Sequence, residues 1–316
     1  MTNSKRTAVV FPGQGSQRPG MGKDFYDEMA VSRQAFEEAS DALGWDVAVM
    51  CFGDDEKLNL TEFTQPCIVT TEIAMMRGLA ERWGFAPSYF GGHSLGEFTA
   101  LVCAGVLPFS ETVKIVQARG RLMQDAVPVG VGGMAAVISE QIDVDKLRQL
   151  ISGLEVDVAN INSANQVVIS GKKEALPEAQ KMLEQSLAGD KPFRFVHLNV
   201  SAPFHSRFMK TIEGPFADVL QAAARLINGE NAPCVTSNFR GGFHEEAVDR
   251  IKENLIKQLS NAVNWRENMK SLASKSESVY EVGPGRPLRD FFRTIGVTCQ
   301  SITGLSAAQK SFAGEV

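Results

Sequence analysis

The first feature of this sequence that could do chemistry is a serine placed between two glycines, in Gly92-His93-Ser94-Leu95-Gly96. The pattern G-x-S-x-G is typical of a nucleophile elbow, a sharp turn from a strand into a helix that exposes the serine Oγ. Glycine is needed on both sides of Ser94 because a side chain there would collide with neighbouring backbone. The N–H of Leu95, at the start of the helix, would face a developing oxyanion. An ordinary Gly/Ser turn is the alternative, because so short a pattern also arises by chance.

A nucleophilic serine needs a base within hydrogen-bond reach, and the chain has 4 histidines. His205 lies in a loop between two predicted subdomains, which makes it the candidate base. His197 falls inside a predicted strand, and His244 lies in a glycine-rich segment that we expect to be exposed. The ring of His93 should point away from the nucleophile. From the pattern alone, a catalytic and a structural role for His205 carry equal weight.

The first apolar run of the chain, residues 7–11, predicts a buried parallel strand that ends in a glycine-containing loop at residues 12–17. Ligands of α/β proteins usually bind at this carboxyl edge of the sheet. In the loop, the side-chain amide of Gln14 can donate a hydrogen bond, and a glutamine solvated by water is the alternative. The loop is not a dinucleotide-binding fingerprint, because Arg18 stands where the third glycine would be.

The elements that must position these residues alternate between strands and helices, which predicts an α/β fold. A helix that opens near residue 110 carries Arg119 close to its apolar face, on which Met123 lies. Arg121, on the same helix, is interpreted as a surface residue. The other expected helices are residues 32–43, 65–83 (capped by Thr64), 95–103, 207–226, 245–259 and 287–293, the further strands are 232–237 and 279–282, and residues 307–316 should fray.

The stretch between residues 134 and 200 has the expected order strand, helix, strand, strand, helix, strand. This is the order of a ferredoxin-like unit. We therefore predict a ferredoxin-like small subdomain at residues 131–200, inserted in an α/β-hydrolase-like large subdomain with a parallel sheet at residues 1–130 and 201–316. The expected strands are residues 134–139, 156–161, 166–170 and 193–200, and the expected helices are 144–151 and 174–187.

The composition argues against several classes of function. The chain has 316 residues, of which 44% are hydrophobic and 22% charged, as is usual for a globular enzyme. A net charge of −5 argues against a nucleic-acid binder. No stretch reaches the ~20 apolar residues of a membrane span, and no signal region precedes the first strand, so we expect a cytoplasmic protein. The 5 cysteines are widely spaced, and no histidine pair has metal-ligand spacing, so neither disulfides nor a metal site are predicted.

Six segments together resemble the malonyl-CoA:acyl carrier protein transacylase family, which includes transacylases of fatty-acid synthesis and acyltransferases of polyketide synthases. The resemblance covers nearly the whole chain, with the motifs in the family's order, and is far more specific than the elbow alone. The segments are Phe11-Pro12-Gly13-Gln14-Gly15-Ser16-Gln17, Thr64-Gln65-Pro66, Gly92-His93-Ser94-Leu95-Gly96-Glu97, Asn160-Ile161-Asn162-Ser163, Ala202-Pro203-Phe204-His205-Ser206 and Glu281-Val282-Gly283-Pro284-Gly285.

The resemblance implies a ping-pong acyl transfer. Ser94 would attack the thioester of malonyl-CoA with His205 as base, and the malonyl-enzyme would pass its acyl group to the phosphopantetheine thiol of an acyl carrier protein. Gln14 and the Leu95 N–H would form the oxyanion hole. In this family a backbone carbonyl orients the histidine, and we assign that role to Gln258. No cofactor is expected beyond the CoA thioester and the phosphopantetheine of the acceptor.

The resemblance also implies which residues select the acyl group. Arg119 matches the family's carboxylate-binding arginine, and a guanidinium fork can bind a carboxylate with two hydrogen bonds. Phe204 resembles the position at which bulk disfavours the α-methyl of methylmalonyl, a preference of ~1–3 kcal/mol, with simple packing as the alternative. Asn160 and Asn162 match cleft positions that either touch the pantetheine arm or cap their own turn. Met123 is also expected to contact the substrate.

Two other functions are weighed against malonyl transfer. A hydrolase that clears acyl groups from carrier proteins would gain nothing from Arg119, and a non-catalytic docking module would not need the full set of candidate residues. The sequence around His205 resembles the polyketide branch, so the fatty-acid and polyketide pathways both stay open. Arg286, Arg289 and Arg293 either meet an acidic carrier protein or form a solvated face, which we favour. We expect a monomer.

Overall fold

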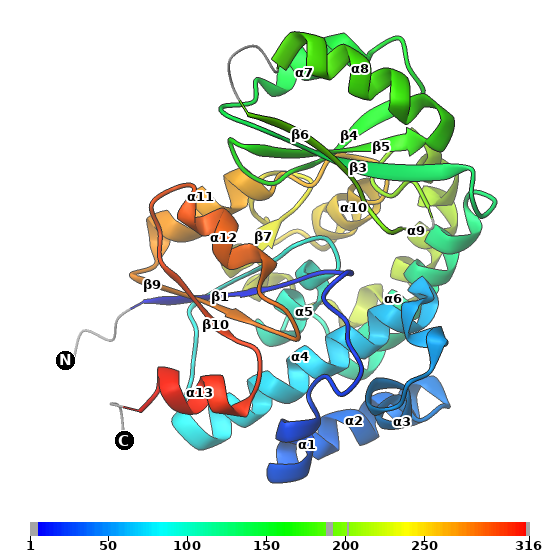
Figure 1. Cartoon of the computed structure of the whole chain (residues 1–316). Coiled ribbons are helices and arrows are strands. Elements are labelled where there is room, and N and C mark those ends of the chain that lie inside the picture. The colour runs from blue at the N-terminus through cyan, green and yellow to red at the C-terminus, as the bar shows by residue number, and fades with distance from the viewer. Residues whose placement is uncertain (1–5, 188–191, 201, 314–316) are drawn as a thin grey trace.

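The computed structural model describes residues 6–187, 192–200 and 202–313 of the chain. Its parallel strands are β1 (Thr7–Phe11), β2 (Tyr89–Gly92), β9 (Ser278–Val282) and β10 (Cys299–Ile302). They form a sheet in the order β10-β9-β1-β2, and a separate antiparallel sheet lies beyond its carboxyl edge (Figure 1). The predicted α/β class with a parallel sheet is confirmed, although β10 is absent from the sequence-based prediction.

The parallel sheet is buried on both faces, which explains the unbroken apolar run in β1. Val9 and Phe11 pack on one side of the sheet, and Ala8 and Val10 pack on the other. Because alternate side chains of a strand point to opposite faces, all of them must be apolar here. The first side is covered chiefly by α5 (Gly96–Cys103) and α4 (Thr61–Trp83), and α6 (Phe109–Asp125) packs on α4. The second side is covered by α11 (Trp265–Lys275) and α12 (Pro287–Arg293).

Helix α4 begins earlier than the sequence pattern predicts. Its first residue is Thr61, and Thr64 lies inside the helix and does not cap it. The Thr64 N–H already bonds the carbonyl of Leu60, the N-cap residue, and the buried Thr64 hydroxyl points back to the carbonyls of Leu58 and Leu60. Pro66 consequently lies in the second turn of α4.

The antiparallel sheet has the strand order β4-β5-β3-β6, and every neighbouring pair is antiparallel. Two helices, drawn at the top of Figure 1, cover one face of this sheet, which is the ferredoxin-like arrangement that the sequence predicts. The other face has no covering helix of its own and points toward the carboxyl edge of the parallel sheet. The elements are β3 (Gly132–Ser139), α7 (Val144–Ile151), β4 (Val156–Ile161), β5 (Gln166–Lys172), α8 (Leu176–Leu187) and β6 (Phe193–His197).

The segment after residue 201 is less regular than predicted. The expected helix at residues 207–226 is divided into η3 (Arg207–Ile212), α9 (Glu213–Ala222) and η4 (Ala224–Leu226). The expected strand at 232–237 is wrong in its first half, because η5 (Gly229–Cys234) carries Pro233 inside it. Its second half is extended: Val235 makes a parallel β-bridge with Phe90, and β7 (Thr236–Ser237) pairs with β8 (Gly242–Phe243). Helix α10 (Val248–Gln258) follows.

The end of the described chain does not fray from residue 307 as expected. Helix α13 (Leu305–Ser311) packs onto the sheet through the buried Ala308, and Phe312 stacks on Trp83 and Tyr280. Residues 314–316 of that expectation lie outside the described residues. The remaining elements are α1 (Lys23–Glu28), α2 (Ala30–Leu43), α3 (Val47–Phe52), η1 (Glu56–Asn59) and η2 (Lys173–Ala175).

The register of β1 and β2 decides where the candidate residues meet. Phe11, the last residue of β1, pairs with Gly92, the last residue of β2. The loop that carries Gln14 and the turn that carries Ser94 therefore leave the sheet side by side at its carboxyl edge. Among the described residues, no helix is both long enough and apolar enough to cross a bilayer.

Candidate active site

Ser94 sits on a tight turn between β2 and α5. Its φ is 50°, a left-handed conformation that is strained for a residue with a side chain. A Cβ at Gly92 would lie 1.9 Å from the carbonyl carbon of Gly96, and a Cβ at Gly96 would lie 2.1 Å from the Phe11 oxygen. Both flanking positions must therefore be glycine, and the turn has the geometry of a nucleophile elbow.

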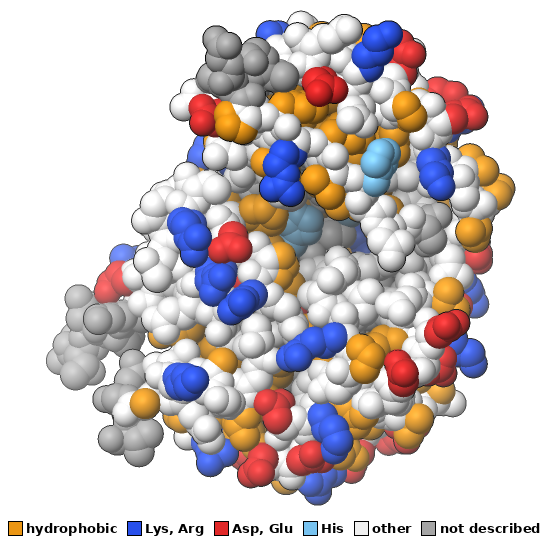
Figure 2. All heavy atoms as spheres, in the orientation of Figure 1, with side chains coloured by type: hydrophobic (Ala, Val, Ile, Leu, Met, Phe, Trp, Pro, Cys, Tyr) orange, Lys and Arg blue, Asp and Glu red, His pale blue; other side chains and the backbone are white. Residues whose placement is uncertain are grey.

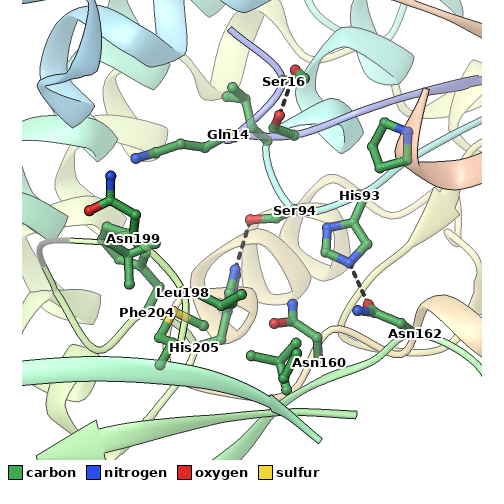
Figure 3. Close-up of a pocket in the computed structure, with 18 of the residues that line it drawn as sticks. Gln14, Ser16, His93, Ser94, Asn160, Asn162, Leu198, Asn199, Phe204 and His205 are labelled. Carbon is green, nitrogen blue, oxygen red and sulfur yellow. Dashed lines mark hydrogen bonds between the residues drawn. The ribbon is translucent and has the colours of Figure 1, made fainter. Parts of the chain in front are cut away.

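His205 is in hydrogen-bond contact with Ser94. Its Nε2 lies 2.7 Å from the Ser94 Oγ, a contact that Figure 3 marks with a dashed line. Its Nδ1 lies 2.7 Å from the backbone oxygen of Gln258. Because a carbonyl oxygen only accepts, Nδ1 carries the proton, and Nε2 is free to accept the proton of the Ser94 hydroxyl. The structure thus joins three residues that are far apart in sequence into a serine, histidine and carbonyl chain.

The surroundings of His205 keep its ring neutral. Its side chain is buried. Burial and the nearby Arg119 cation lower the pKa of His205 to about 3, although the hydrogen bond to the Gln258 carbonyl acts to raise it. A neutral imidazole is the form that can take a proton from a hydroxyl. Both conditions for a general base, contact and protonation state, are therefore met.

Arg119 is a buried cation beside the nucleophile. It is 1% exposed, and its Nη2 donates to the Ser94 Oγ at 3.2 Å. The guanidinium is held by two neutral amide oxygens, Gln65 Oε1 at 2.9 Å and Gln258 Oε1 at 2.8 Å. No carboxylate of the described residues forms a salt bridge with it. Burial lowers the pKa of Arg119 to about 10, and the charge of Glu97 opposes that shift.

Gln14 lies beside the elbow, but its side chain faces another partner than the sequence suggests. Its Nε2 donates to Thr61 Oγ1 at 3.1 Å, so this amide is occupied. The backbone N–H groups of Gln14 and Leu95 have no hydrogen-bond partner within the described chain. A Cβ on the adjacent Gly13 would lie 3.7 Å from the Leu95 nitrogen, which shows how closely the loop packs on the elbow. Two free backbone donors thus border Ser94.

The two asparagines of β4 and the following turn differ in their contacts. Asn162 is engaged with other side chains: its Oδ1 contacts His93 Nε2 at 2.8 Å, and its Nδ2 donates to Gln166 Oε1 at 2.8 Å. This contact turns the His93 ring away from Ser94, as Figure 3 shows. The side chain of Asn160 makes no hydrogen bond to the described residues and faces the cavity.

A cavity of about 710 Å³ unites these residues. It lies between the carboxyl edge of the parallel sheet and the open face of the antiparallel sheet, and Figure 2 shows the hollow between these two parts. A cavity of this size suits a small acyl group together with a pantetheine arm. Gln258 does not line the cavity but is hydrogen-bonded to Arg119 and His205. The predicted site residues that line the cavity are Gln14, Ser94, Leu95, Arg119, Met123, Asn160, Asn162, Phe204 and His205.

Arg286, just before α12, and Arg289 and Arg293 on that helix do not line the cavity. Arg289 and Arg293 each pair with Asp290 at 3.5 Å, and Arg293 is largely exposed. The inward residues of the helix, Leu288 and Phe291, line the cavity instead.

Four buried polar residues near the elbow have no role in the sequence-based prediction. They are Gln65, Glu97, Asn238 and His244. The expectation that His244 is exposed is wrong: it is 3% exposed, and its Nε2 lies 2.8 Å from Glu97 Oε1. The short β7–β8 pair carries this glycine-rich segment inward, an arrangement that its composition does not indicate. Gln65 and Glu97 lie in the quoted motifs, and that placement is the only sequence signal that points to them.

Comparisons with known proteins agree with this geometry. Residues 8–285 match the family model described as "Acyl transferase domain". The malonyl CoA-acyl carrier protein transacylase of Escherichia coli strain K12 is 40% identical over 294 residues, which cover 91% of this chain and 92% of that protein. The corresponding protein of Bacillus subtilis strain 168 is 36% identical, with 94% and 92% covered.

Solved structures agree as well. A malonyl CoA-acyl carrier protein transacylase from Clostridium perfringens superposes with a TM-score of 0.89 at 35% identity, covering 98% of this chain and 96% of that one. A malonyl-transacylase in complex with a type II PKS acyl-carrier protein has a TM-score of 0.87 at 33% identity, with 98% and 99% covered. The chain belongs to the acyl transferase family and, within it, to the malonyl-CoA:acyl carrier protein transacylases.

Proposed function

We propose that this chain transfers a malonyl group from malonyl-CoA to the phosphopantetheine thiol of an acyl carrier protein, through a malonyl ester on Ser94. The curated relatives are transacylases of this type, which supports the reaction. The observation that carries the proposal is the buried Arg119, a cation 3.2 Å from the Ser94 Oγ without a carboxylate partner in the described chain. A buried cation of this kind fits a substrate that brings its own carboxylate.

In the first half-reaction, the Ser94 oxygen attacks the thioester carbonyl while His205 Nε2 accepts the hydroxyl proton. The carbonyl oxygen becomes an oxyanion, which the backbone N–H groups of Gln14 and Leu95 stabilise; one such donor is typically worth ~10²–10³ in rate. When the C–S bond breaks, the sulfur of CoA leaves with the proton that His205 holds. The product is a malonyl ester on Ser94.

The second half-reaction reverses these roles with a different thiol. His205 takes the proton of the phosphopantetheine thiol, the sulfur attacks the ester carbonyl, and the Ser94 oxygen leaves with that proton. We propose that no resident cofactor takes part, because the substrate already carries the activated thioester. The Gln258 carbonyl keeps the same imidazole tautomer for both steps.

The acyl group is selected by its surroundings in the cavity. Arg119 turns its guanidinium from the neutral amide oxygens of Gln65 and Gln258 toward the malonyl carboxylate, and Met123 and Phe204 line the same space. Phe204 disfavours an α-methyl group by ~1–3 kcal/mol. Asn160, whose side chain has no partner among the described residues, is placed to receive the pantetheine arm.

Intact-mass spectrometry tests this proposal. Mixed with malonyl-CoA, the protein should gain one malonyl group on Ser94, and added holo carrier protein should remove it as malonyl-carrier protein. Release of free malonate at the rate of adduct loss would favour the hydrolase instead, and absence of any adduct would favour a docking module. A Ser94→Ala variant serves as the control for labelling at other nucleophiles.

The remaining expectations from the sequence stay predictions. The carrier protein can belong to fatty-acid or polyketide synthesis. Apart from Val129 and Val131, which share one loop, the large exposed hydrophobic residues of the described chain lie on different elements, which agrees with a monomer. These residues are Val49, Leu60, Val129, Val131, Val196 and Leu226. The cytoplasmic location and the absence of nucleic-acid or membrane partners likewise rest on the sequence alone.

A further inference from the structure

We propose that Glu97 is a positioning residue for the nucleophile, because one of its carboxylate oxygens orients the two side-chain amides that hold the backbone of Ser94. The inference rests on the proposed function, in which Ser94 is the residue that becomes acylated. Glu97 does not line the cavity and touches no substrate, so its effect must pass through Asn238 and Gln258.

Glu97 is a buried carboxylate whose two oxygens are fully hydrogen-bonded. It is 0% exposed, and its Oε2 accepts from the backbone N–H of Asn238 at 3.0 Å, from the Asn238 side-chain amide, and from Gln258 Nε2 at 2.7 Å. Its Oε1 accepts from His244 Nε2 at 2.8 Å. A buried carboxylate with four donors holds them firmly, because a donor that moved away would be left without a partner and without water.

The two side-chain amides that bond Glu97 also bond the backbone N–H and the backbone oxygen of Ser94. The Oδ1 of Asn238 accepts from the Ser94 N–H at 3.3 Å, and its Nδ2 donates to the Gly92 oxygen at 2.9 Å. The Nε2 of Gln258 donates to the Ser94 oxygen at 3.0 Å. Both backbone polar groups of the nucleophile are therefore held by side chains that share one carboxylate oxygen.

The carboxylate also fixes which end of each amide faces the elbow. If Gln258 turned its amide end for end, its oxygen would face both the Ser94 oxygen and Glu97 Oε2, and two acceptors would repel it. The same holds for Asn238, whose amide nitrogen faces Glu97 and the Gly92 oxygen. The orientation that keeps Ser94 in place is thus the one that Glu97 enforces.

The backbone of Ser94 needs such support. Its φ of 50° is strained for a serine, and strained residues persist only where their surroundings over-determine them. Gln258 further extends the effect, since its Oε1 accepts from Arg119 and its backbone oxygen accepts from His205. Through Gln258, the Glu97 carboxylate is therefore connected to the nucleophile, the base and the acyl-selecting cation.

The test compares a variant that removes the acceptor with one that keeps it. Glu97→Met has a similar volume and no acceptor of comparable strength. In Glu97→Gln, the amide oxygen can take the place of Oε2. The amide nitrogen can donate to His244 when that ring carries its proton on Nδ1 and the Asn254 amide turns its oxygen toward it. Rapid-quench mass spectrometry with malonyl-CoA gives two quantities, the rate constant of Ser94 malonylation and its amplitude.

We expect Glu97→Met to lower the rate constant by about 10²-fold, the typical effect of a displaced reacting group, and Glu97→Gln to stay within ~10-fold of the parent. A merely structural role would lower the amplitude, which counts folded molecules, and leave the rate constant unchanged. Glu72→Met is the matched control: Glu72 is also 0% exposed and bonds Thr99, so its loss should change stability without changing the rate constant.

Three outcomes would overturn the inference: a Glu97→Met rate constant within ~3-fold of the parent, equal slowing by Met and Gln, or equal slowing by Glu72→Met. If Glu97→Met does not fold, the effect of Glu97→Gln is measured in a Gln258→Met background, which keeps the backbone carbonyl that holds His205. Glu97→Gln should then slow malonylation less in that background than in the parent, and equal slowing in both overturns the inference. Failure of the parent itself to form the adduct would refute the proposed function instead.

Discussion

Replacing Arg119 by alanine should convert the site from one that prefers malonyl-CoA to one that accepts acetyl-CoA at least as well. The guanidinium lies 3.2 Å from the Ser94 Oγ, and its other hydrogen bonds in the described chain go to the amide oxygens of Gln65 and Gln258. It also lies over the Phe98 ring, 5.5 Å from the centroid. Its removal leaves those amides free to bond each other or water. The acyl carboxylate, by contrast, would enter a buried site with no cation to meet it.

The magnitude follows from burial. Leaving one partner of a buried ion pair alone costs about 3–5 kcal/mol. Each ~1.4 kcal/mol corresponds to a factor of ten, so kcat/KM for malonyl-CoA should fall by about 10²- to 4 × 10³-fold. Acetyl-CoA has no carboxylate, and its kcat/KM should stay within ~3-fold or rise, since the Ser94 Oγ also loses a donor that makes it less basic.

The assay is the acylation of Ser94 with each thioester, followed by mass spectrometry, and the decisive quantity is the malonyl-to-acetyl ratio of kcat/KM. Loss of folded protein would lower both values together and leave the ratio unchanged. For Arg119→Lys, the malonyl-to-acetyl ratio should fall between the values of the parent and of Arg119→Ala, because lysine keeps the charge but cannot form two parallel hydrogen bonds to a carboxylate. Equal losses for both substrates in Arg119→Ala would refute the carboxylate-binding role.

Three further predictions concern the base, the elbow and the last helix. Because burial lowers the pKa of His205 from 6.5 to about 3, the acylation rate should not fall with an apparent pKa near 6.5. In the window between these values the unfolded chain binds a proton that the native chain does not, so stability to urea should decrease as the pH falls through it; a rise would contradict the buried, neutral base. Gly92→Ala should abolish acylation, since its Cβ would lie 1.9 Å from the Gly96 carbonyl carbon; near-parent activity would contradict the elbow geometry. Phe312→Ala should lower the free energy of unfolding by about 3–5 kcal/mol, measured by denaturant titration, and a loss below ~1 kcal/mol would mean that α13 is not docked.

The sequence predicts the parts of this fold that local patterns encode. The apolar run of β1, the glycine spacing around Ser94 and the strand and helix order of the small antiparallel unit all depend on neighbouring residues. By contrast, β10 and α13 are short and gain their stability from packing on the sheet, as the stacked ring of Phe312 shows. Their local pattern alone is too weak to predict them.

The site divides in the same way. The resemblance predicts which residues contact the substrate, and the structure brings Ser94, His205 and Arg119 together. The buried polar layer behind them could not be predicted, because Asn238 and His244 reach Glu97 only through the tertiary fold. The Gln14 side chain shows a related limit: its amide bonds Thr61, a contact set by the start of α4, and we therefore propose its backbone N–H for the oxyanion role.

The structure of the malonyl-enzyme, obtained by exposing crystals to malonyl-CoA, tests the account most directly. We expect an ester on Ser94 Oγ whose free carboxylate accepts two hydrogen bonds from the Arg119 guanidinium, with the ester carbonyl oxygen in contact with the Gln14 and Leu95 N–H groups. An ester whose carboxylate points to solvent, or whose carbonyl oxygen contacts neither N–H, would contradict it.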